Sequence, residues 1–550
     1  MSSSHTLAEA LREYLRLALS SANQPILITA QDSREYDASR QIFNRKFDFR
    51  PAVIAKAGNA EQVSAIVRFA RAAPMAARLR VRSGGHDHAG ECSGTDVILI
   101  DCSPMKEVEK LRELPAGEAE IRIGAGVRFR ELKPKLDDWK LGIPHGTCRT
   151  VGVTGYTLGG GWGPWTRRYG MGCERLIGAT LVLGDGEIVQ LRDTDAPDSR
   201  NGLLLWALRG GGGMSYGIVT ELRYRAFAVP GEAYSFHTAL RRDSTLETLR
   251  LWEEMIADDR HPEMIGSSLR VSARHLREGE AADVHATLPC VFLGFIEGSR
   301  EQAIDLVRHY FGDDAADHIV FDEDQDSDGE GWQFDHWDGR LPPQALRLQG
   351  LEQVASDNGI ELEKEGPAPH KITSRLVAAR GWNDEGRAAL VRSLQSPFAA
   401  PRRQDSQDDD NCDVHTYITL LAIAGPFYAD YRRPDPIGSA FPYGDRPYII
   451  QYQAWWDQYL DSDGRVEPQF ADRLQRYALR NRYHSNLAED WIDACRGYPL
   501  PGTDGAFISF KDEAVPTAEY FGKHYHQLRQ IKREHSRDKD LLFQTAKTII

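Results

Sequence analysis

Two glycine-rich segments constrain this 550-residue chain more than any other feature. Residues 82–90 read R-S-G-G-H-D-H-A-G, and residues 146–163 read G-T-C-R-T-V-G-V-T-G-Y-T-L-G-G-G-W-G. Because glycine has no Cβ atom, turns of this kind let backbone N–H groups converge on an anion. Each segment also holds one reactive side chain, His86 in the first and Cys148 in the second. Two such turns in one domain favour a ligand with a pyrophosphate and a long body, that is, a dinucleotide.

The sequence around these segments predicts an α+β fold. Residues 60–73 have the apolar spacing of a helix, and residues 129–136 begin another. Short apolar or alternating runs are typical of strands. These runs are residues 52–55, 79–82, 97–101, 120–127 and 217–220. Gly184-Asp185-Gly186 separates two further apolar runs, which predicts a β-hairpin.

The pattern changes after about residue 228. Longer strand-like segments lie at 291–296, 415–424 and 448–456, and helical segments lie at 300–310 and 383–394. We therefore expect a domain over residues 1–228 that opens with a helix over 1–30. A second domain over 229–465 is expected to hold an antiparallel sheet covered by helices. Residues 466–550 are predicted to be helical and are rich in charge.

Composition and charge argue against several classes of protein. The net charge of −14 argues against a nucleic-acid partner, because phosphate binding needs a basic surface. The longest apolar run, near residues 417–428, is too short to span a membrane. The N-terminus lacks the basic and continuously apolar regions of a secretory signal, so we expect a cytoplasmic protein. The seven cysteines form no Cys-x-x-Cys pair, which argues against a zinc or disulfide scaffold.

The glycine pattern differs from two common nucleotide-binding fingerprints. Residues 159–163 follow no clear strand, and no acidic residue ends a second strand about 20 positions later, as a Rossmann site requires. The G-x-x-x-x-G-K-[ST] loop is absent. The glycines alone also fit ordinary tight turns.

Four motifs in order give a more specific indication. Residues 81–86, 146–152, 159–163 and 205–213 resemble motifs of the berberine bridge enzyme-like FAD-linked oxidases, flavoproteins of the vanillyl-alcohol oxidase or PCMH type. The resemblance runs from about residue 50 to 225 and resumes at 441–456 and 520–550. It implies a two-lobed FAD-binding domain, a substrate-binding domain, and a C-terminal segment over 466–550 that returns to the FAD-binding domain.

The resemblance also implies that FAD is attached by two covalent bonds. In such enzymes the histidine of the S-G-G-H turn is bonded to the 8α-methyl group of FAD, and the cysteine of the G-x-C turn to flavin C6. These residues are His86 and Cys148 here, and Arg149 stands where the family usually has proline. Taken alone, a capping histidine and a buried cysteine would be ordinary. The other FAD-binding residues implied by the motifs are Arg82, Ser83, Gly84, Gly85, Val151, Gly152, Gly155, Tyr156, Gly160, Gly161, Trp162, Gly217, Ile218, Val219, Tyr520 and Phe521.

Two of these residues are expected to tune the flavin. Tyr156 stands where relatives often have a histidine near the flavin N1–C2=O edge, and a donor there would stabilise the anionic reduced flavin. A tyrosine that only packs is the alternative. Val151 holds the position that controls oxygen access in this family, and a small residue there goes with oxidase behaviour. We therefore expect O2 as the acceptor and H2O2 as a product.

Removal of a hydride needs a base for the substrate proton. The strand 448–452 resembles the family's L-Y-x-I-Q-Y motif, in which Gln451 can orient a substrate but cannot act as a base. The family's Y-x-N-Y motif appears here as H-S-N-L, so both of its tyrosines are missing. We expect His484, the first residue of that stretch, to be the base, because imidazole titrates near neutral pH. Further candidates are His88, Tyr417 and His415.

The sequence therefore predicts an FAD-dependent oxidase that acts on a small organic molecule of specialised metabolism. An oligosaccharide oxidase, a flavin dehydrogenase and a redox-neutral flavoprotein are the alternatives. Trp455, Trp456 and Trp332 are candidates to line the substrate cavity. Departures from the family pattern in residues 520–524 and 535–543 indicate a divergent member, and they leave the substrate open.

One acidic stretch needs separate mention. Residues 324–335 fit a calcium-binding loop except that the last ligand position is Asp335 rather than glutamate. Flanking helices are not evident, so a solvated acidic loop is the favoured interpretation and no metal is expected. The oligomeric state is left open.

Overall fold

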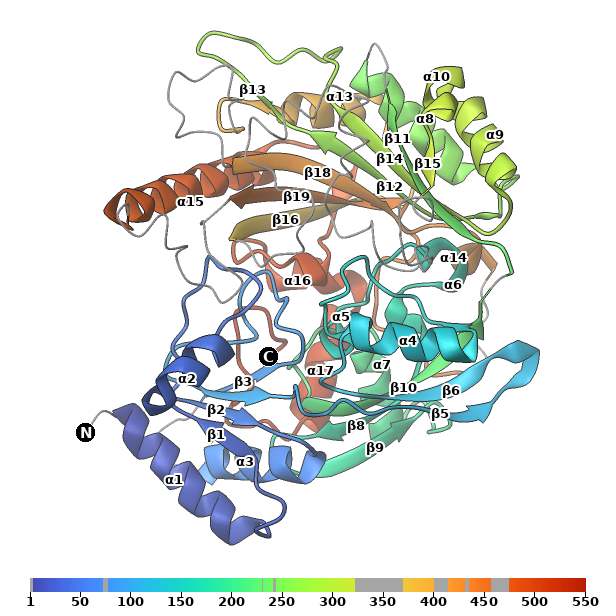
Figure 1. Ribbon diagram of the computed structural model, residues 1–550. Coiled ribbons are helices and arrows are strands. Elements are labelled where there is room, and N and C mark those ends of the chain that lie inside the picture. Colours follow the sequence, from blue (N-terminus) through green and yellow to red (C-terminus); the bar gives the residue numbers. More distant parts are fainter. Residues whose placement is uncertain are drawn as a thin grey trace.

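The fold is described from a computed structural model (Figure 1). The structure describes residues 3–72, 78–229, 231–240, 244–321, 369–399, 414–430, 435–456 and 474–550. The acidic residues 324–335, weighed above as a calcium-binding loop, and Trp332 lie outside the described residues.

The chain begins with a small sheet whose order is β1-β2-β4-β3. Three of its strands are parallel: β2 (Val53–Lys56), β3 (Leu79–Arg82) and β4 (Ile98–Asp101). The helix α3 (Ala60–Ala72) connects β2 to β3, which confirms the expected β-α-β unit.

The expected helix over residues 1–30 is too long. Helix α1 spans Ser3–Ala18, and residues 26–28 form β1 (Ile26–Ile28), which pairs antiparallel with β2. Pro25 directly precedes this strand, and proline cannot continue a helix because it lacks a backbone N–H donor.

The second lobe is an antiparallel sheet with the strand order β5-β6-β10-β8-β9. Its strands are β5 (Val108–Glu113), β6 (Ala119–Gly124), β8 (Leu176–Val182), β9 (Ile188–Arg192) and β10 (Ile218–Ala228), and the short β7 (Leu141–Gly142) pairs with β10. β8 and β9 form the hairpin expected around Gly184–Gly186. The helices of this lobe are α4 (Phe129–Trp139), α5 (Val153–Leu158), α6 (Thr166–Tyr169) and α7 (Arg200–Leu208). The expected two-lobed α+β arrangement is therefore confirmed.

An eight-stranded antiparallel sheet dominates the second half of the described chain, with the order β15-β11-β14-β12-β18-β19-β16-β20. The strands are β11 (Tyr234–Leu240), β12 (Met264–Ser272), β14 (Cys290–Ile296), β15 (Val320–Phe321), β16 (His370–Val377), β18 (Val414–Ala422), β19 (Tyr448–Trp456) and β20 (Thr503–Asp504). The proposed boundary at residue 228 falls between β10 and β11. The two-stranded pair β13 (Arg274–His275) and β17 (Gln395–Ser396) lies apart from this sheet.

Helices cover the outer face of the eight-stranded sheet, away from the first domain (Figure 1). They are α8 (Thr245–Ala257), α9 (Arg300–Phe311), α10 (Asp313–Asp317), α13 (Asp384–Ser393) and α15 (Leu474–Gly497). Because strand side chains alternate, the residues of β19 divide between two faces. Ile450, Tyr452 and Ala454 belong to the core beneath these helices, whereas Ile449 belongs to a different cluster that includes Trp165 of the first domain.

The chain returns to the first domain later than residue 466. Helix α15 packs on β16 and β19, and β20 still pairs with β16. Helices α16 (Thr517–Phe521) and α17 (Tyr525–His535) then follow on the first domain, where α17 contacts α7. Earlier in the chain, the short α14 (Pro426–Asp430) also contacts the first domain, through α6. Phe521, Leu528 and Ile549 are buried in the core of the second lobe. No helix in the described ranges is both long enough and apolar enough to cross a bilayer.

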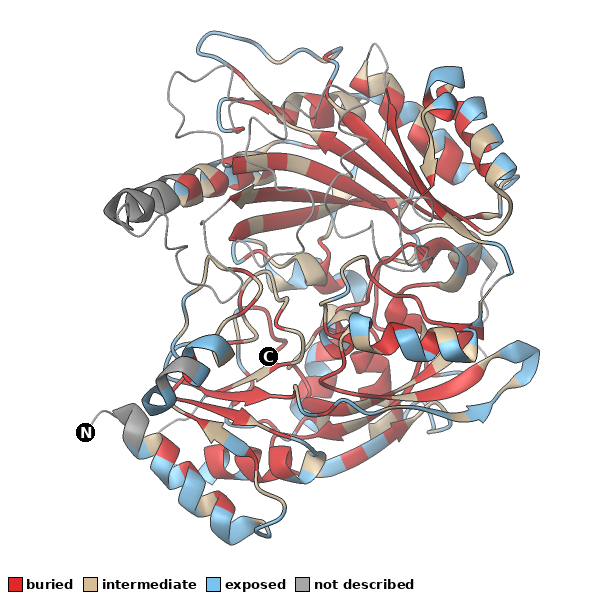
Figure 2. Ribbon diagram, viewed as in Figure 1, coloured by how far each residue is buried: buried red, intermediate tan, exposed pale blue. Residues whose placement is uncertain are grey.

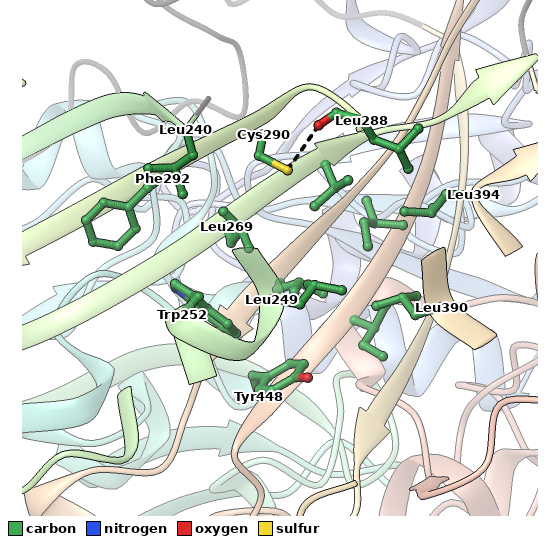
Figure 3. Close-up of a cluster of buried hydrophobic side chains, with 14 of the residues drawn as sticks. Leu240, Leu249, Trp252, Leu269, Leu288, Cys290, Phe292, Leu390, Leu394 and Tyr448 are labelled. Carbon is green, nitrogen blue, oxygen red and sulfur yellow. Dashed lines mark hydrogen bonds between the residues drawn. The ribbon is translucent and has the colours of Figure 1, made fainter. Parts of the chain in front are cut away.

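The strands of all three sheets are mostly buried (Figure 2). In the core of the second domain, Trp252 of α8 is fully buried (Figure 3). Its Nε1 donates a hydrogen bond to Ser267 Oγ at 2.8 Å, and its ring meets the Tyr448 ring edge-on at 4.9 Å. The indole therefore ties a covering helix to two strands.

We expect Trp252→Ala to reduce the free energy of unfolding of the second domain by about 3–5 kcal/mol, because truncation leaves a large cavity. Thermal and urea unfolding would measure this loss. Leu17→Ala, at a side chain that is 73% exposed, is the control and should change stability by less than about 0.5 kcal/mol. Equal stability of the two variants would contradict the role assigned to Trp252.

Candidate active site

The two glycine-rich turns meet backbone to backbone. A Cβ atom added to Gly84 would lie 2.2 Å from the backbone nitrogen of Gly152, and one added to Gly152 would lie 2.4 Å from the nitrogen of Gly84. Real side chains do not tolerate such distances, so both positions need glycine. Ser83 Oγ, beside this contact, donates to the carbonyl of Ala125 at 2.6 Å. The first turn is thereby fixed against the second lobe.

This contact brings the two reactive side chains together. Thr150 Oγ1 lies 2.9 Å from His86 Nε2 and 3.2 Å from Cys148 Sγ. The imidazole and the thiol thus both contact the hydroxyl group of Thr150. Phe43 stacks on the His86 ring at 3.8 Å, and burial holds the pKa of His86 well below its usual value. The imidazole is therefore neutral near pH 7.

The other residues expected at the flavin are glycines in turns, an arginine held in an ion pair, and buried side chains. Gly160 and Gly161 have φ values of 101° and 80°, which favour glycine, and Gly155 faces open space. Arg82, by contrast, is committed to a salt bridge with Asp101 at 2.6 Å. The buried residues that support the site from the protein core are Trp162, Ile218, Val219, Tyr520 and Phe521. Gly85 and Gly217 also have positive φ.

Tyr156 lies in a pocket made by glycines. Cβ atoms added to Gly146, Gly161 or Gly172 would meet its ring at 3.1, 2.5 and 2.6 Å. Burial raises the pKa of its hydroxyl well above the usual value, so the group stays a donor. This hydroxyl is buried and has no hydrogen-bond partner among the described residues. A buried donor of this kind favours a bound acceptor, because an unsatisfied hydroxyl is costly.

The inner face of the eight-stranded sheet carries a polar network opposite these turns. Gln453 Nε2 donates to Thr419 Oγ1 at 3.0 Å and to Gln451 Oε1 at 3.1 Å. Gln453 Oε1 accepts from Tyr417 OH at 3.2 Å and from Trp455 Nε1 at 3.0 Å. The amide oxygen of Gln451 is therefore engaged, and its N–H groups remain as donors for a bound molecule.

The sheet register fixes which candidate residues share this face. Tyr417 is opposite Gln453, and His415 is opposite Trp455, so all four project from the inner face. Trp456 projects from the other face and belongs to the core under the helices. The inner face thus collects Gln451, Tyr417 and His415 as expected, whereas Trp456 cannot line the same space.

His484 does not join them. It is buried on α15, one helical turn from Ala488, whose side chain packs in the outer core together with Trp491. The sheet therefore lies between His484 and Gln451. The expectation that His484 is the base is therefore wrong, because α15 places this histidine against the outer face of the sheet.

His88 has a partner that the sequence did not indicate. His88 Nδ1 lies 2.8 Å from Nε2 of His370, the first residue of β16. The His370 ring lies 4.0 Å from the Trp455 ring, and Phe43 lies 6.1 Å from His370. His370 was missed because the contact joins residues 282 positions apart and follows no motif.

A half-buried ion cluster holds the turn that contains His86 and His88. Lys511, next to Phe510 of the C-terminal segment, contacts Asp87 Oδ2 at 2.5 Å and Glu91 Oε2 at 3.0 Å. The two carboxylates raise the pKa of Lys511, although burial alone would lower it. Its positive charge in turn lowers the pKa of Asp87. The cluster ties the first glycine-rich turn to the C-terminal segment.

Comparison with known proteins agrees with this geometry. Residues 51–192 match the model of an FAD-binding domain family. The chain is 31% identical to a glucooligosaccharide oxidase of Sarocladium strictum over 45% of its own length and 48% of that protein. It is 28% identical to berberine bridge enzyme-like 21 of Arabidopsis thaliana over 92% of its own length and 84% of that protein. In the sequence comparison, the chain thus spans about half the length of the oligosaccharide oxidases it matches.

The fold is shared with a solved structure of glucooligosaccharide oxidase from Acremonium strictum, with a TM-score of 0.68 and 18% identity. That likeness covers 98% of this chain and 99% of the other. The name of that structure describes a 6-S-cysteinyl, 8α-N1-histidyl FAD. Residues 51–192 therefore belong to this FAD-binding domain family, and the chain as a whole shares the fold of solved oligosaccharide oxidases and berberine bridge enzyme-like proteins.

Proposed function

We propose that this chain is an FAD-dependent oxidase whose flavin is attached to His86 and Cys148. The observation that carries the proposal is the placement of both side chains on the hydroxyl of Thr150. Two side chains that contact one small group lie close enough together for both to reach the same end of a flavin ring. The chemistry of each group supports attachment, since a neutral imidazole and a thiol can both bond to electrophilic carbon.

The site fits FAD in three further ways. Thr150 engages Nε2 of His86, which leaves Nδ1 for the bond to the cofactor. Gly155 offers backbone next to open space, where a side chain would intrude on a ligand. The hydroxyl of Tyr156 is a buried donor without a protein partner among the described residues, as a flavin carbonyl would require. Gly84, Gly85, Gly152, Gly160, Gly161 and Gly217 would complete the walls.

FAD, when bound, takes a hydride from a substrate carbon and passes the electrons to O2, which gives H2O2. The residues of this chain have the remaining tasks. Gln451 would orient the substrate through its amide N–H groups. Val151, which packs against the core of the second lobe, would leave the path of oxygen open. A base would take the substrate proton, and His88, Tyr417 and His415 are the candidates on this side of the sheet.

The substrate class is part of the proposal. The main proposal is a small organic alcohol or amine of specialised metabolism. The polar inner face favours a second candidate, an oligosaccharide, because amide groups and a tryptophan ring suit hydroxyl-rich ligands. Three relatives are oxidases of glucose, xylose or chitin oligosaccharides by name. Peroxide release from a panel of alcohols, amines and oligosaccharides would separate the candidates, and a dehydrogenase or redox-neutral protein would release none.

Covalent attachment is tested by acid precipitation. We expect the wild-type pellet to be yellow and the flavin to travel with peptides that contain His86 and Cys148. His86→Ala and Cys148→Ala should each keep one linkage, and the double variant should release all FAD. Cys495→Ala, at a buried thiol in the second domain, is the control. A colourless wild-type pellet would refute attachment.

Gly155→Ala separates a ligand effect from a folding effect. Because an added Cβ would meet nothing within 4 Å, and alanine is favoured in helices over glycine by about 1 kcal/mol, the protein without FAD should be at least as stable as wild type. We expect the FAD content to fall, as measured by absorbance at equal protein. Gly231→Ala, also in open space, should keep full FAD content. Full FAD in both variants would remove Gly155 from the site.

Val151→Leu tests the proposed oxygen path. The larger side chain should slow reoxidation of the reduced flavin by air, while anaerobic reduction by substrate is unchanged. Stopped-flow absorbance would follow the two half-reactions separately. Reoxidation at the wild-type rate would mean that oxygen reaches the flavin by another route.

A further inference from the structure

His88 and His370 form a hydrogen-bonded pair at the junction of the two domains. The bond joins His88 Nδ1 and His370 Nε2 at 2.8 Å, and the two rings meet edge-on. A neutral imidazole has one N–H donor and one acceptor nitrogen. When His88 Nδ1–H donates to His370 Nε2, the lone pair of His88 Nε2 is therefore left to accept a proton.

Burial distinguishes the two ends of the pair. His370 is fully buried, whereas His88 is half-buried. His370 is also enclosed by Phe43 and Trp455, with ring centroids at 6.1 and 4.0 Å. Only the His88 end is open to an incoming molecule. The accessible nitrogen of the pair is consequently His88 Nε2.

The pair lies beside the residue proposed to carry the flavin. His86 and His88 belong to the same turn, and Phe43 stacks on His86 while it also contacts His370. Trp455, the other neighbour of His370, donates a hydrogen bond to Gln453, and Gln453 in turn donates one to Gln451. The pair thus bridges the cofactor turn and the polar inner face of the sheet.

Asn44 fixes the main chain on both sides of the pair. Its Nδ2 donates to the carbonyl of His88 at 2.7 Å and to that of His370 at 3.1 Å, and its Oδ1 accepts from the backbone N–H of His370 at 3.1 Å. The side chain is 1% exposed. A buried amide with three bonds to two segments sets their separation, so the imidazole contact is built into the fold.

Burial and the surrounding charges leave His88 neutral near pH 7. Burial lowers the pKa of His88 to about 4; the Asp87 carboxylate opposes this shift, and Lys511 reinforces it. Lys511 is in turn bonded to Asp87 and Glu91. Further titratable groups near the pair are His86 in the same turn, on which Arg128 also acts, and His415, which shares the inner face with Trp455.

We propose that His88 accepts the substrate proton at Nε2 and that His370 positions it and shares the resulting positive charge through their common hydrogen bond. This rests on the proposed oxidase function. In the step, the substrate O–H or N–H bond breaks and an N–H bond forms at His88. The hydride leaves the substrate carbon for the flavin, and a C=O or C=N bond forms.

The first experiment measures anaerobic reduction of the bound flavin by a substrate that the panel identifies. His88→Gln should slow reduction by about 10²- to 10⁴-fold with the FAD content unchanged. His370→Gln should slow it less. His309→Gln, on the exposed face of α9, should reduce at the wild-type rate. Reduction of His88→Gln at the wild-type rate would overturn the proposal.

Chemical rescue and pH dependence separate proton transfer from structural support. Added imidazole should restore reduction in His88→Ala in proportion to its concentration, whereas a merely structural residue would not be replaced by a dissolved base. A neutral base loses activity when it is protonated, so the wild-type rate should persist below pH 6.5 and fall as the pH approaches about 4. The absence of rescue at full FAD content would count against His88.

A readout without turnover tests the pair itself. Because the two imidazoles share one bond, the melting temperature of His88→Gln/His370→Gln should be no lower than that of the less stable single variant. Additive losses would show that the rings do not interact, and this would overturn the proposal. If no substrate reduces the wild-type flavin, the proposed function fails, whereas the melting temperatures still decide whether the pair exists.

Discussion

The contact between Gly84 and Gly152 is the constraint on which the site depends. Two turns from different lobes of the first domain approach so closely that neither can carry a Cβ atom. This approach brings both His86 and Cys148 within hydrogen-bond distance of Thr150 Oγ1. Any side chain at the contact would separate the two nucleophiles. The glycines therefore determine the chemistry of the site even though they take no part in it.

The eight-stranded sheet serves two purposes because its inner face is divided. At one end Ile449, Leu376 and Leu421 pack with Trp165 of the first domain and seal the junction. At the other end two of these strands, β18 and β19, present Tyr417, Gln451 and Gln453. The apolar end sets the spacing between the domains, and the polar end faces the cofactor turns across that spacing. One strand register thus fixes both the interface and the lining of the site.

Local sequence patterns were sufficient for most of the elements. The strand at residues 79–82, the strand at 448–456 and the hairpin around Gly184–Gly186 follow from apolar patterns and turn residues, which act over a few positions. Helix α1 was predicted too long because Pro25 and the short strand after it were not weighed against the helical pattern. The return of the chain to the first domain was also placed too early, because the packing of α15 on β19 depends on contacts far apart in the sequence.

The same distinction explains the site. His86 and Cys148 stand in motifs, so they could be named from the sequence, although the shared contact with Thr150 could not. His484 also stands at a motif position, but its direction depends on which side of the sheet α15 covers. His370 stands in no motif, and only the pairing of β16 with β19 brings it to His88. Contacts between residues far apart in the sequence cannot be predicted from local sequence patterns.

The Lys511 cluster has a consequence for biosynthesis. Every described strand of the second domain's sheet, including β20 at Thr503–Asp504, is synthesised before Lys511. The ammonium group of Lys511 nevertheless anchors Asp87 and Glu91 in the turn that carries His86. The turn consequently acquires its final shape only near the end of translation. A chain that ended before residue 511 would lack the ammonium group that holds Asp87 and Glu91, and with it the anchor of this turn.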